Sequence, residues 1–362
     1  MGGAEQKYVK EAFDTNWIAP VGFHISDFEK KLSKIALNYN IAALSSGTAA
    51  IHLALILLGI THGDDVICSS FTFSATVNPI KYLGANPILI DSESDSWNMC
   101  PELLELAIKE GIAINKKPKA IIMVHLYGMP AKMDQIMHIA NFYDIPVIED
   151  AAEAFGSQYR DNYVGCFGDI ATFSFFGNKT ITTGEGGMLA SNNEALIKRA
   201  AHLKSQSVSS AKEYWHDEIG FNFRMTNICA AIGLAQLEGA DVVLQKKQKI
   251  AQWYQDELAG AGLKFQIAEE GAINSYWMVT IVAESADSRD EIRSFLKAHA
   301  VETRPVFYPA HTMPAFFQSE CFPVAERLSG RGINLPSFPD LSQDDVVSIC
   351  NLIKNCLDNS IL

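Results

Sequence analysis

A single lysine follows a turn between two apolar runs, where its amine could do covalent chemistry. The β-rich run 171–176 ends at Gly177 and Asn178, a turn signal, and Lys179 follows within a neutral segment rich in Thr and Gly. A lysine held away from water there could have a lowered pKa and undergo Schiff-base chemistry. The alternative is an exposed loop lysine, and this segment by itself does not decide between the two.

A second candidate is an acid that follows another apolar run. The strand-like run 146–148 leads into Glu149 and Asp150, and Glu153 follows three residues after Asp150. Asp150 at the carboxyl end of a buried strand could pair with a cationic nitrogen of a ligand. The alternative is a helix N-cap that accepts hydrogen bonds from free backbone N–H groups. Taken by itself, this segment favours the N-cap.

A third candidate is the stretch LSSGTAA, residues 44–50, between a strand and a buried helix. Backbone N–H groups at a helix N-terminus bind anions, and the hydroxyls of Ser46 and Thr48 flank Gly47 as further donors. The stretch is not a Walker A loop, because it lacks the Gly-Lys-Ser/Thr element. Ordinary helix capping requires the same residue types and is the alternative.

Together the three segments supply a Schiff-base lysine, an acid for a ring nitrogen and a phosphate cradle. These are the three contacts that pyridoxal phosphate requires. A nicotinamide dehydrogenase is disfavoured, because no G-x-G-x-x-G opens a strand–helix turn in this sequence.

The elements that must position these residues follow from the apolar pattern. Short apolar strands alternate with helical periods, with strands at 65–68, 87–90, 120–124 and 146–148 and helices at 49–58, 73–83, 101–109 and 132–141. This alternation predicts an α/β fold with a mainly parallel sheet covered on both faces, where ligands bind at the carboxyl ends of strands.

The pattern changes near residue 236. One long charged helix is predicted at 236–258, followed by a strand at 277–282 and helices at 290–298 and 342–357. We therefore expect a large domain, 1–235, and a smaller α+β domain, 236–362, that includes the long connecting helix. The length of 362 residues fits two domains.

Composition excludes several classes of partner. The net charge of −13 argues against nucleic acid or an anionic membrane. No apolar stretch is long enough to span a bilayer, and the N-terminus lacks the pattern of a signal peptide, so we expect no membrane partner. The seven cysteines are odd in number, widely spaced and without a CxxC pair. They favour a reduced cytoplasmic protein without a metal site.

The whole chain also resembles a known family, the fold-type I pyridoxal-phosphate sugar aminotransferases often named for DegT, DnrJ and StrS. The motifs that carry the resemblance occur in order along the sequence: NWIAPVG (16–22), SSGTAA (45–50), SSFTFSAT (69–76), VHLYG (124–128), EDAAEAFG (149–156), FSFFGNKTITTGEGGM (173–188), FNFRMTN (221–227), TRPVFYPAHTMP (303–314) and GINLPS (332–337). The resemblance implies a large domain with a mainly parallel seven-stranded sheet between helices, and a smaller α+β domain.

The resemblance implies a role for each residue that matches a family motif. Lys179 is similar to the catalytic lysine that binds the cofactor covalently and moves a proton. Asp150 would pair with the pyridine nitrogen, and Glu153 would lie near the ring hydroxyl. Phe73 would stack on the ring, although a core aromatic is the commoner fate of a phenylalanine.

The phosphate contacts implied by the resemblance come from Gly47, Thr48 and Ser174. Asn222 is similar to a residue that reaches the phosphate from the partner subunit. The active site would then be shared between the two chains of a homodimer. Family members usually carry several residues before the position of Met1, so we expect any N-terminal contact with substrate to lie outside this sequence.

The resemblance also implies a substrate class, a nucleotide-linked 4-keto-6-deoxy sugar with glutamate as amino donor. The N-terminal motifs favour UDP-2-acetamido-4-keto-2,6-dideoxyglucose, as in bacillosamine-type pathways. The alternative, from the C-terminal motifs and SYWM (275–278), is GDP-4-keto-6-deoxymannose, the substrate of perosamine synthases. A related dehydratase subgroup has histidine where this chain has Lys179, and a non-catalytic member would be expected to lack Lys179 or Asp150.

Four residues are candidates for contact with the sugar nucleotide: Arg304, His311, Asn178 and Tyr308. An arginine can bind a diphosphate or a carboxylate through two hydrogen bonds. His311 could equally be a packed core histidine with satisfied hydrogen bonds. His125 is expected to be structural, and Trp17 to be a hydrophobic anchor.

Overall fold

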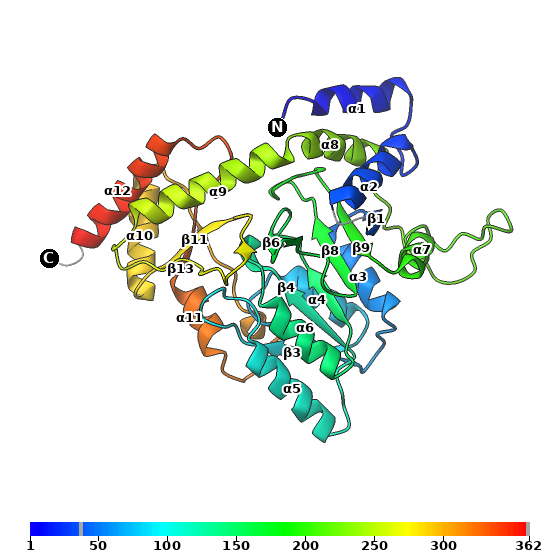
Figure 1. The fold of residues 1–362 in the computed structure, drawn as a ribbon, viewed down its shortest axis with the longest axis horizontal. Coiled ribbons are helices and arrows are strands. Elements are labelled where there is room, and N and C mark those ends of the chain that lie inside the picture. Colours follow the sequence, from blue (N-terminus) through cyan, green and yellow to red (C-terminus); the bar gives the residue numbers. More distant parts are fainter. Residues whose placement is uncertain (36–38, 360–362) are drawn as a thin grey trace.

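The computed structural model describes residues 1–35 and 39–359. Its centre is a sheet of seven strands in the order β1-β9-β8-β5-β4-β2-β3 (Figure 1). Only β9 runs against its neighbours within this sheet, and the other pairs are parallel. The strand bounds are β1 Asn40–Leu44, β2 Asp65–Ser69, β3 Asn86–Ile90, β4 Ala120–Val124, β5 Val147–Asp150, β8 Ile170–Ser174 and β9 Gly187–Ser191.

The sheet is buried on both faces, as the uninterrupted apolar strands predicted. Along β4, Ile121 and Met123 belong to a cluster with side chains of helices α5 and α6, whereas Ala120 and Ile122 belong to a cluster with side chains of α3 and α4. Successive side chains of a strand face opposite sides, so a strand covered on both faces must be apolar throughout. The helices are α3 Gly47–Leu57, α4 Ser74–Tyr82, α5 Pro101–Ala113, α6 Met133–Phe142 and α7 Glu194–Leu203.

The predicted single helix at 236–258 is wrong. The structure has two helices, α8 Asn227–Glu238 and α9 Ala240–Glu257, which meet at Gly239 with a bend of 62°. The hydroxyl of Thr226 caps α8 by accepting from the Cys229 amide. Helix α8 packs on α1 Glu5–Asp14 and α2 Phe23–Ile35, whereas α9 packs on α12 Gln343–Asn359. The two halves of the predicted helix therefore pack on different parts of the chain, α8 on N-terminal helices and α9 on the C-terminal helix.

The C-terminal part of the chain, where we expect the smaller domain, contains a three-stranded antiparallel sheet in the order β11-β13-β12. Its core joins this sheet to α9, α10 and α12. The chain then returns to the large domain, because Val306, Phe322 and Leu328 pack in the same cluster as α3. The remaining elements are β6 Gln158–Tyr159, β7 Asn162–Tyr163, β10 Ala272–Ile273, β11 Val279–Val282, β12 Arg304–Pro305, β13 Gly332–Leu335, α10 Ala286–Ala298, α11 Pro323–Arg331 and the 3-10 turns η1 Leu126–Gly128 and η2 Ala310–Thr312.

No single helix in 1–35 or 39–359 is long and apolar enough to cross a bilayer. Helices α8 and α9 meet the criteria of length and composition only when they are taken together across their bend.

Candidate active site

Lys179 lies in the loop between β8 and β9, and its side chain is only 13% exposed. Its Nζ atom lies 3.8 Å from the ring centroid of Trp277 and 3.9 Å from Oε1 of Glu153. Burial lowers the pKa of Lys179, and the negative charges of Glu153 and Asp150 partly oppose that effect. The sequence left open whether Lys179 is buried or exposed. In the structure its amine is buried, because the side chains of Trp277 and Glu153 lie against it.

Asp150 is the last residue of β5, at the carboxyl edge of the sheet between β4 and β8. Its carboxylate accepts a hydrogen bond from the Thr76 hydroxyl at 2.7 Å and one from the Ala152 amide at 3.2 Å. Burial raises the pKa of Asp150, and these donors and Lys179 only partly offset it. Within the described residues the structure records no ion pair for this carboxylate, so it is a buried acid that lacks a cationic partner.

Glu153 is buried beside Asp150 and accepts a hydrogen bond from the Tyr127 amide at 2.7 Å. Burial raises the pKa of Glu153 to about 7, although Lys179 acts in the opposite direction. Tyr127 holds its amide in place with a φ of 57°, a left-handed conformation that is costly for a bulky residue. A strained backbone thus positions the acid nearest to Lys179.

The N-terminus of α3 forms a cradle against the end of β8. Ser46 caps the helix by accepting from the Ala49 amide, and the Gly47 and Thr48 amides have no acceptor within the described residues. A Cβ on Gly47 would lie 2.9 Å from the Cβ of Ser174, so only glycine allows this approach. Free amides at a helix N-terminus beside two hydroxyls, those of Thr48 and Ser174, suit a phosphate.

Phe73 precedes α4 and is 54% exposed, with its ring 5.5 Å from that of Phe307. Phe307 also contacts Tyr127 and Trp277, so the four rings form one aromatic cluster that joins the two domains. The exposed ring of Phe73 is not a core aromatic, and its stacking on a cofactor stays a prediction.

Asn222 is exposed in the single chain and belongs to the segment that runs beside the cradle. The Ser45 amide donates to the backbone oxygen of Phe223 at 2.8 Å, and Leu44 forms a bridge with Arg224. The cradle therefore lies next to the segment that contains Asn222, whose contact across a subunit interface stays a prediction.

Residues 1–354 match the model of the DegT/DnrJ/EryC1/StrS aminotransferase family. The chain belongs to this family. A GDP-perosamine synthase of Escherichia coli O157:H7 is 48% identical over 97% of this chain and 95% of its own length. Another GDP-perosamine synthase, from Vibrio cholerae, is 41% identical over 98% of this chain and 96% of its own.

A solved structure agrees with this assignment. The PLP-form of a putative sugar aminotransferase from Streptococcus pneumoniae, Spr1654, superposes with a TM-score of 0.91 at 26% identity, over 98% of this chain and 96% of that one. The expected fold and the expected class, a pyridoxal-phosphate-dependent transaminase, are therefore both confirmed.

The residues present fit the cofactor of this aminotransferase family. Asp150 is a buried acid without a cation, as a protonated pyridine nitrogen requires, and Lys179 is a buried amine near it. The α3 cradle offers free amides where Gly47 permits a close approach. The glycine, lysine and acid come from three separate segments, which the parallel sheet brings to one edge.

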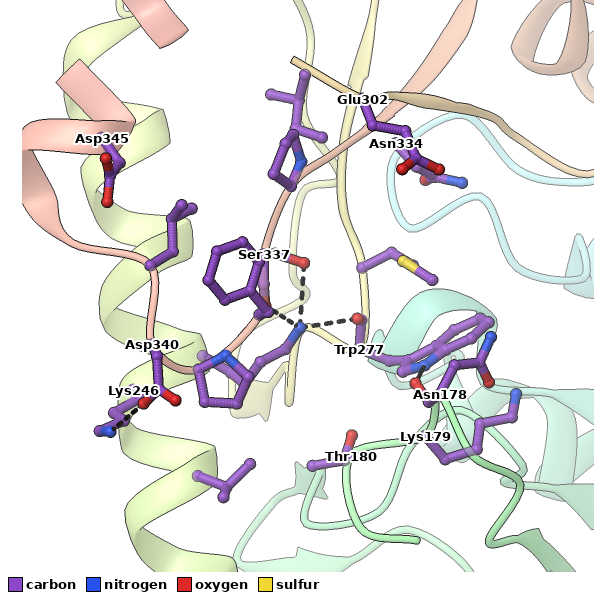
Figure 2. A pocket seen from close by; sticks show the side chains of 18 of the residues that line it. Asn178, Lys179, Thr180, Lys246, Trp277, Glu302, Asn334, Ser337, Asp340 and Asp345 are labelled. Atoms are coloured by element: carbon purple, nitrogen blue, oxygen red, sulfur yellow. Dashed lines mark hydrogen bonds and ion pairs between the residues drawn. The ribbon is translucent and has the colours of Figure 1, made fainter. Parts of the chain in front are cut away.

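A cleft of about 1240 Å³ opens beside Lys179 in this aminotransferase, between the large domain, α9 and the turn after β13. Asn178, Lys179 and Thr180 line one end of it (Figure 2). Arg304 is also among its lining residues. Asp150, Glu153 and the cradle are not among its lining residues. The cleft therefore reaches Lys179 from the side of Trp277.

The four predicted substrate residues differ in accessibility. Arg304 is exposed, with its nearest acid, Glu302, at 3.8 Å, and Asn178 is exposed in the cleft lining. Tyr308 is exposed but outside that lining. These three remain predictions.

His311 is buried, and both ring nitrogens are satisfied. One lies 2.7 Å from the Ser70 hydroxyl and the other 3.2 Å from the Glu326 carboxylate, while the ring stacks on Phe322. This is the geometry of the packed core histidine, the alternative that the sequence left open. His125 is also fully buried and binds Glu149, as expected for a structural residue.

Three residues near the site were not assigned to it from the sequence. Thr76 donates to Asp150, Tyr127 donates to Glu153, and Trp277 covers Lys179. All three lie in quoted motifs, namely SSFTFSAT, VHLYG and SYWM. The motifs were the available signal, but which of their side chains face the site depends on the tertiary structure.

Proposed function

We propose that this chain transfers an amino group from glutamate to C4 of a nucleotide-linked 4-keto-6-deoxy sugar. The observation that carries the reaction is the Lys179 amine, buried 3.9 Å from Glu153 and held beside the unpaired acid Asp150. Pyridoxal phosphate, when bound, supplies an electron sink for charge that develops at the carbon bearing the amino group.

The residues of this chain would then divide the work. Asp150 would pair with the pyridine nitrogen and keep it protonated. The protonated nitrogen is the cationic partner that the buried carboxylate lacks. Lys179 Nζ would take the proton from the amino-bearing carbon of glutamate and pass it to the cofactor carbon that keeps the amine. With the sugar it would move a proton from that carbon to C4. A lowered pKa prepares a lysine for this role. Glu153 would lie near the ring hydroxyl of the bound cofactor, and the aromatic cluster around Trp277 would limit the access of water to Lys179.

The most similar relatives reported above favour the GDP-linked sugar. Both are GDP-perosamine synthases, and each matches nearly the whole chain. We therefore propose GDP-4-keto-6-deoxymannose as the acceptor, in place of the UDP-2-acetamido sugar that the N-terminal motifs favoured. Arg304 and Asn178, which are exposed and line the cleft, are the residues that we propose to contact it, with Tyr308 as a further candidate.

A substrate panel tests this proposal. Purified holoenzyme is incubated with glutamate and either the GDP-linked or the UDP-linked 4-keto-6-deoxy sugar, and the amino product is identified by mass. We expect amination of the GDP sugar at a higher kcat/KM, and none by a Lys179→Ala variant. Preferential amination of the UDP sugar would refute the GDP sugar as acceptor and support the UDP-2-acetamido sugar instead. Dehydration without amination would refute aminotransfer to either sugar.

We also propose a homodimer with shared active sites, in which Asn222 reaches the phosphate bound by the partner subunit. Its exposure in the single chain leaves it available for such a contact. Mixing Asn222→Ala subunits with Lys179→Ala subunits should restore part of the activity that each loses. No recovery in mixed dimers would refute sharing. The seven cysteines are all free, which supports a reducing compartment, and we propose the cytoplasm.

A further inference from the structure

A buried lysine without a role in the chemistry above lies on helix α9. Lys247 is buried, whereas its neighbour Lys246 is about half exposed and pairs with Asp340. The Lys247 Nζ donates to the backbone oxygen of Trp277 at 2.9 Å, to the backbone oxygen of Ser337 at 2.6 Å and to the Ser337 hydroxyl at 3.1 Å. Figure 2 labels the two acceptor residues, Trp277 and Ser337. An ammonium has three N–H donors, so all of them are used.

The surroundings of Lys247 offer neutral oxygens and, within the described residues, no paired carboxylate. Burial lowers the pKa of Lys247 to about 7. A buried amine costs folding free energy that an apolar side chain of similar length would not cost. Lys247 instead fixes the relative position of three segments. Its ammonium joins α9 to the segment before β11 and to the turn after β13.

Trp277 connects Lys247 to the proposed catalytic lysine, because it contacts both residues. Lys247 holds its backbone oxygen, and the indole N–H donates to the backbone oxygen of Asn178 at 2.8 Å. The indole face then lies 3.8 Å from Nζ of Lys179. The tryptophan is thus fixed at its backbone by the small domain and at its ring by the loop that contains Lys179.

We propose that Lys247 is a positioning residue for transamination, which fixes Trp277 so that the indole covers the Lys179 amine. This inference rests on the proposed role of Lys179. Loss of the Lys247 contacts frees the Trp277 backbone, lets the indole move from the amine and admits water. Because small displacements of reacting groups slow chemistry more than binding, the effect falls on kcat and not on KM.

The test compares Lys247→Met with Lys249→Met, the same change at an exposed lysine of α9 that does not line the cleft. Both holoenzymes are measured in the single-turnover half-reaction with glutamate, for its limiting rate constant (here kcat) and its half-saturating glutamate concentration (here KM). The pH midpoint of the absorption band of the bound cofactor is the third readout. We expect Lys247→Met to lower kcat about tenfold or more with KM nearly unchanged, and to shift the midpoint. Lys249→Met should leave all three at wild-type values.

Trp277→Phe provides the second arm, since it removes the indole and leaves Lys247 in place. It should shift the midpoint in the same direction as Lys247→Met, and the double variant should resemble Trp277→Phe alone. Fully additive losses would overturn the proposal, as would a Lys247→Met enzyme with wild-type kcat and midpoint.

Two further variants keep the test decisive. If Lys247→Met does not fold, Ser337→Ala removes one acceptor and should give a smaller shift in the same direction; an unchanged midpoint would overturn the proposal. The glutamate half-reaction involves no sugar, so an error in the sugar assignment leaves this result intact. A Lys179→Ala variant in which borohydride still fixes the cofactor covalently to the protein would instead overturn the role of Lys179, and with it this inference.

Discussion

Strand β5 ends in two consecutive acids, Glu149 and Asp150, which are both buried but have different surroundings. Glu149 accepts hydrogen bonds from His125 at 3.1 Å and from three backbone amides of the loop 165–168. Burial acts to raise its pKa, but these donors outweigh burial and hold the pKa below its usual value. Among residues 1–35 and 39–359, Asp150 accepts from one hydroxyl and one amide alone, and burial raises its pKa.

The difference separates an acid that builds the fold from an acid that is available for chemistry. The acceptors of Glu149 are filled from within the chain, so it joins β5 to β4 and to the loop before β8. The Asp150 carboxylate is buried and could accept more hydrogen bonds than it does. Its burial costs folding free energy unless a ligand supplies a cation. Four substitutions sharpen or break this comparison.

The largest expected loss of turnover comes from Lys179, the proposed catalytic lysine near Asp150. Lys179→Ala removes the amine that binds the cofactor and moves the proton, so kcat should fall by at least about a thousandfold. Amino product formed per unit time measures the loss. Lys198→Ala, at an exposed lysine paired with Glu194, is the control and should retain wild-type turnover. Normal turnover by Lys179→Ala would remove this residue from the mechanism.

Asp150→Asn tests the open acid itself. An amide cannot hold the ring nitrogen protonated, so kcat should fall about 10²- to 10⁴-fold. The free energy of unfolding of the cofactor-free protein should not decrease, because a buried acid with a raised pKa is replaced by a neutral group. Turnover and urea unfolding are measured on the same preparation. An active but destabilised variant would show that Asp150 belongs with the structural acids.

Glu149→Gln tests the filled acid. The neutral amide accepts fewer and weaker hydrogen bonds from the His125 ring and the loop 165–168, so the protein should lose about 1–3 kcal/mol of stability. Turnover per folded enzyme should change little, because the side chain does not face Lys179. Urea unfolding at fixed pH gives the stability. A large fall in kcat at unchanged stability would contradict the division between the two acids.

Glu153 should give the protein a pH-dependent stability. Its pKa is raised to about 7 in the folded chain from a usual value of 4.5, so the folded state keeps a proton that the unfolded state has released. Its contribution to stability is complete below about 4.5 and is lost as the pH rises through about 7.

Glu153→Gln should therefore flatten the fall in stability between these two pH values, by about 1–3 kcal/mol in the cofactor-free protein. Urea unfolding at a series of pH values measures it, with the exposed Glu194→Gln as control. An unchanged pH profile in Glu153→Gln would mean that Glu153 is ionised throughout the range.

Local apolar patterns predicted most of the large domain. The strand at 120–124 coincides with β4 residue for residue, because five consecutive apolar residues fit a strand covered on both faces. The helix predicted at 236–258 failed at Gly239. A lone glycine is tolerated within helices, and the bend there arises from packing on different partners: α8 contacts α1 and α2, and α9 contacts α12.

The site was predictable where one segment carries the chemistry. Lys179 after a turn, Asp150 after an apolar run and Gly47 at a helix start could each be named from residue types, and ordered motifs joined them. The burial of His311 could not be predicted, since it depends on Ser70 and Glu326, which are far apart in the sequence.

The sequence by itself determined which groups exist and at which strand or helix ends they lie, because local periodicity and turn chemistry decide those elements. Only the tertiary structure decided which of two adjacent acids is filled and which is open. It also placed Trp277 and Lys247, from beyond residue 236, against Lys179. Burial and hydrogen-bond saturation depend on long-range contacts, and these determine whether a lysine or a carboxylate supports the fold or the reaction.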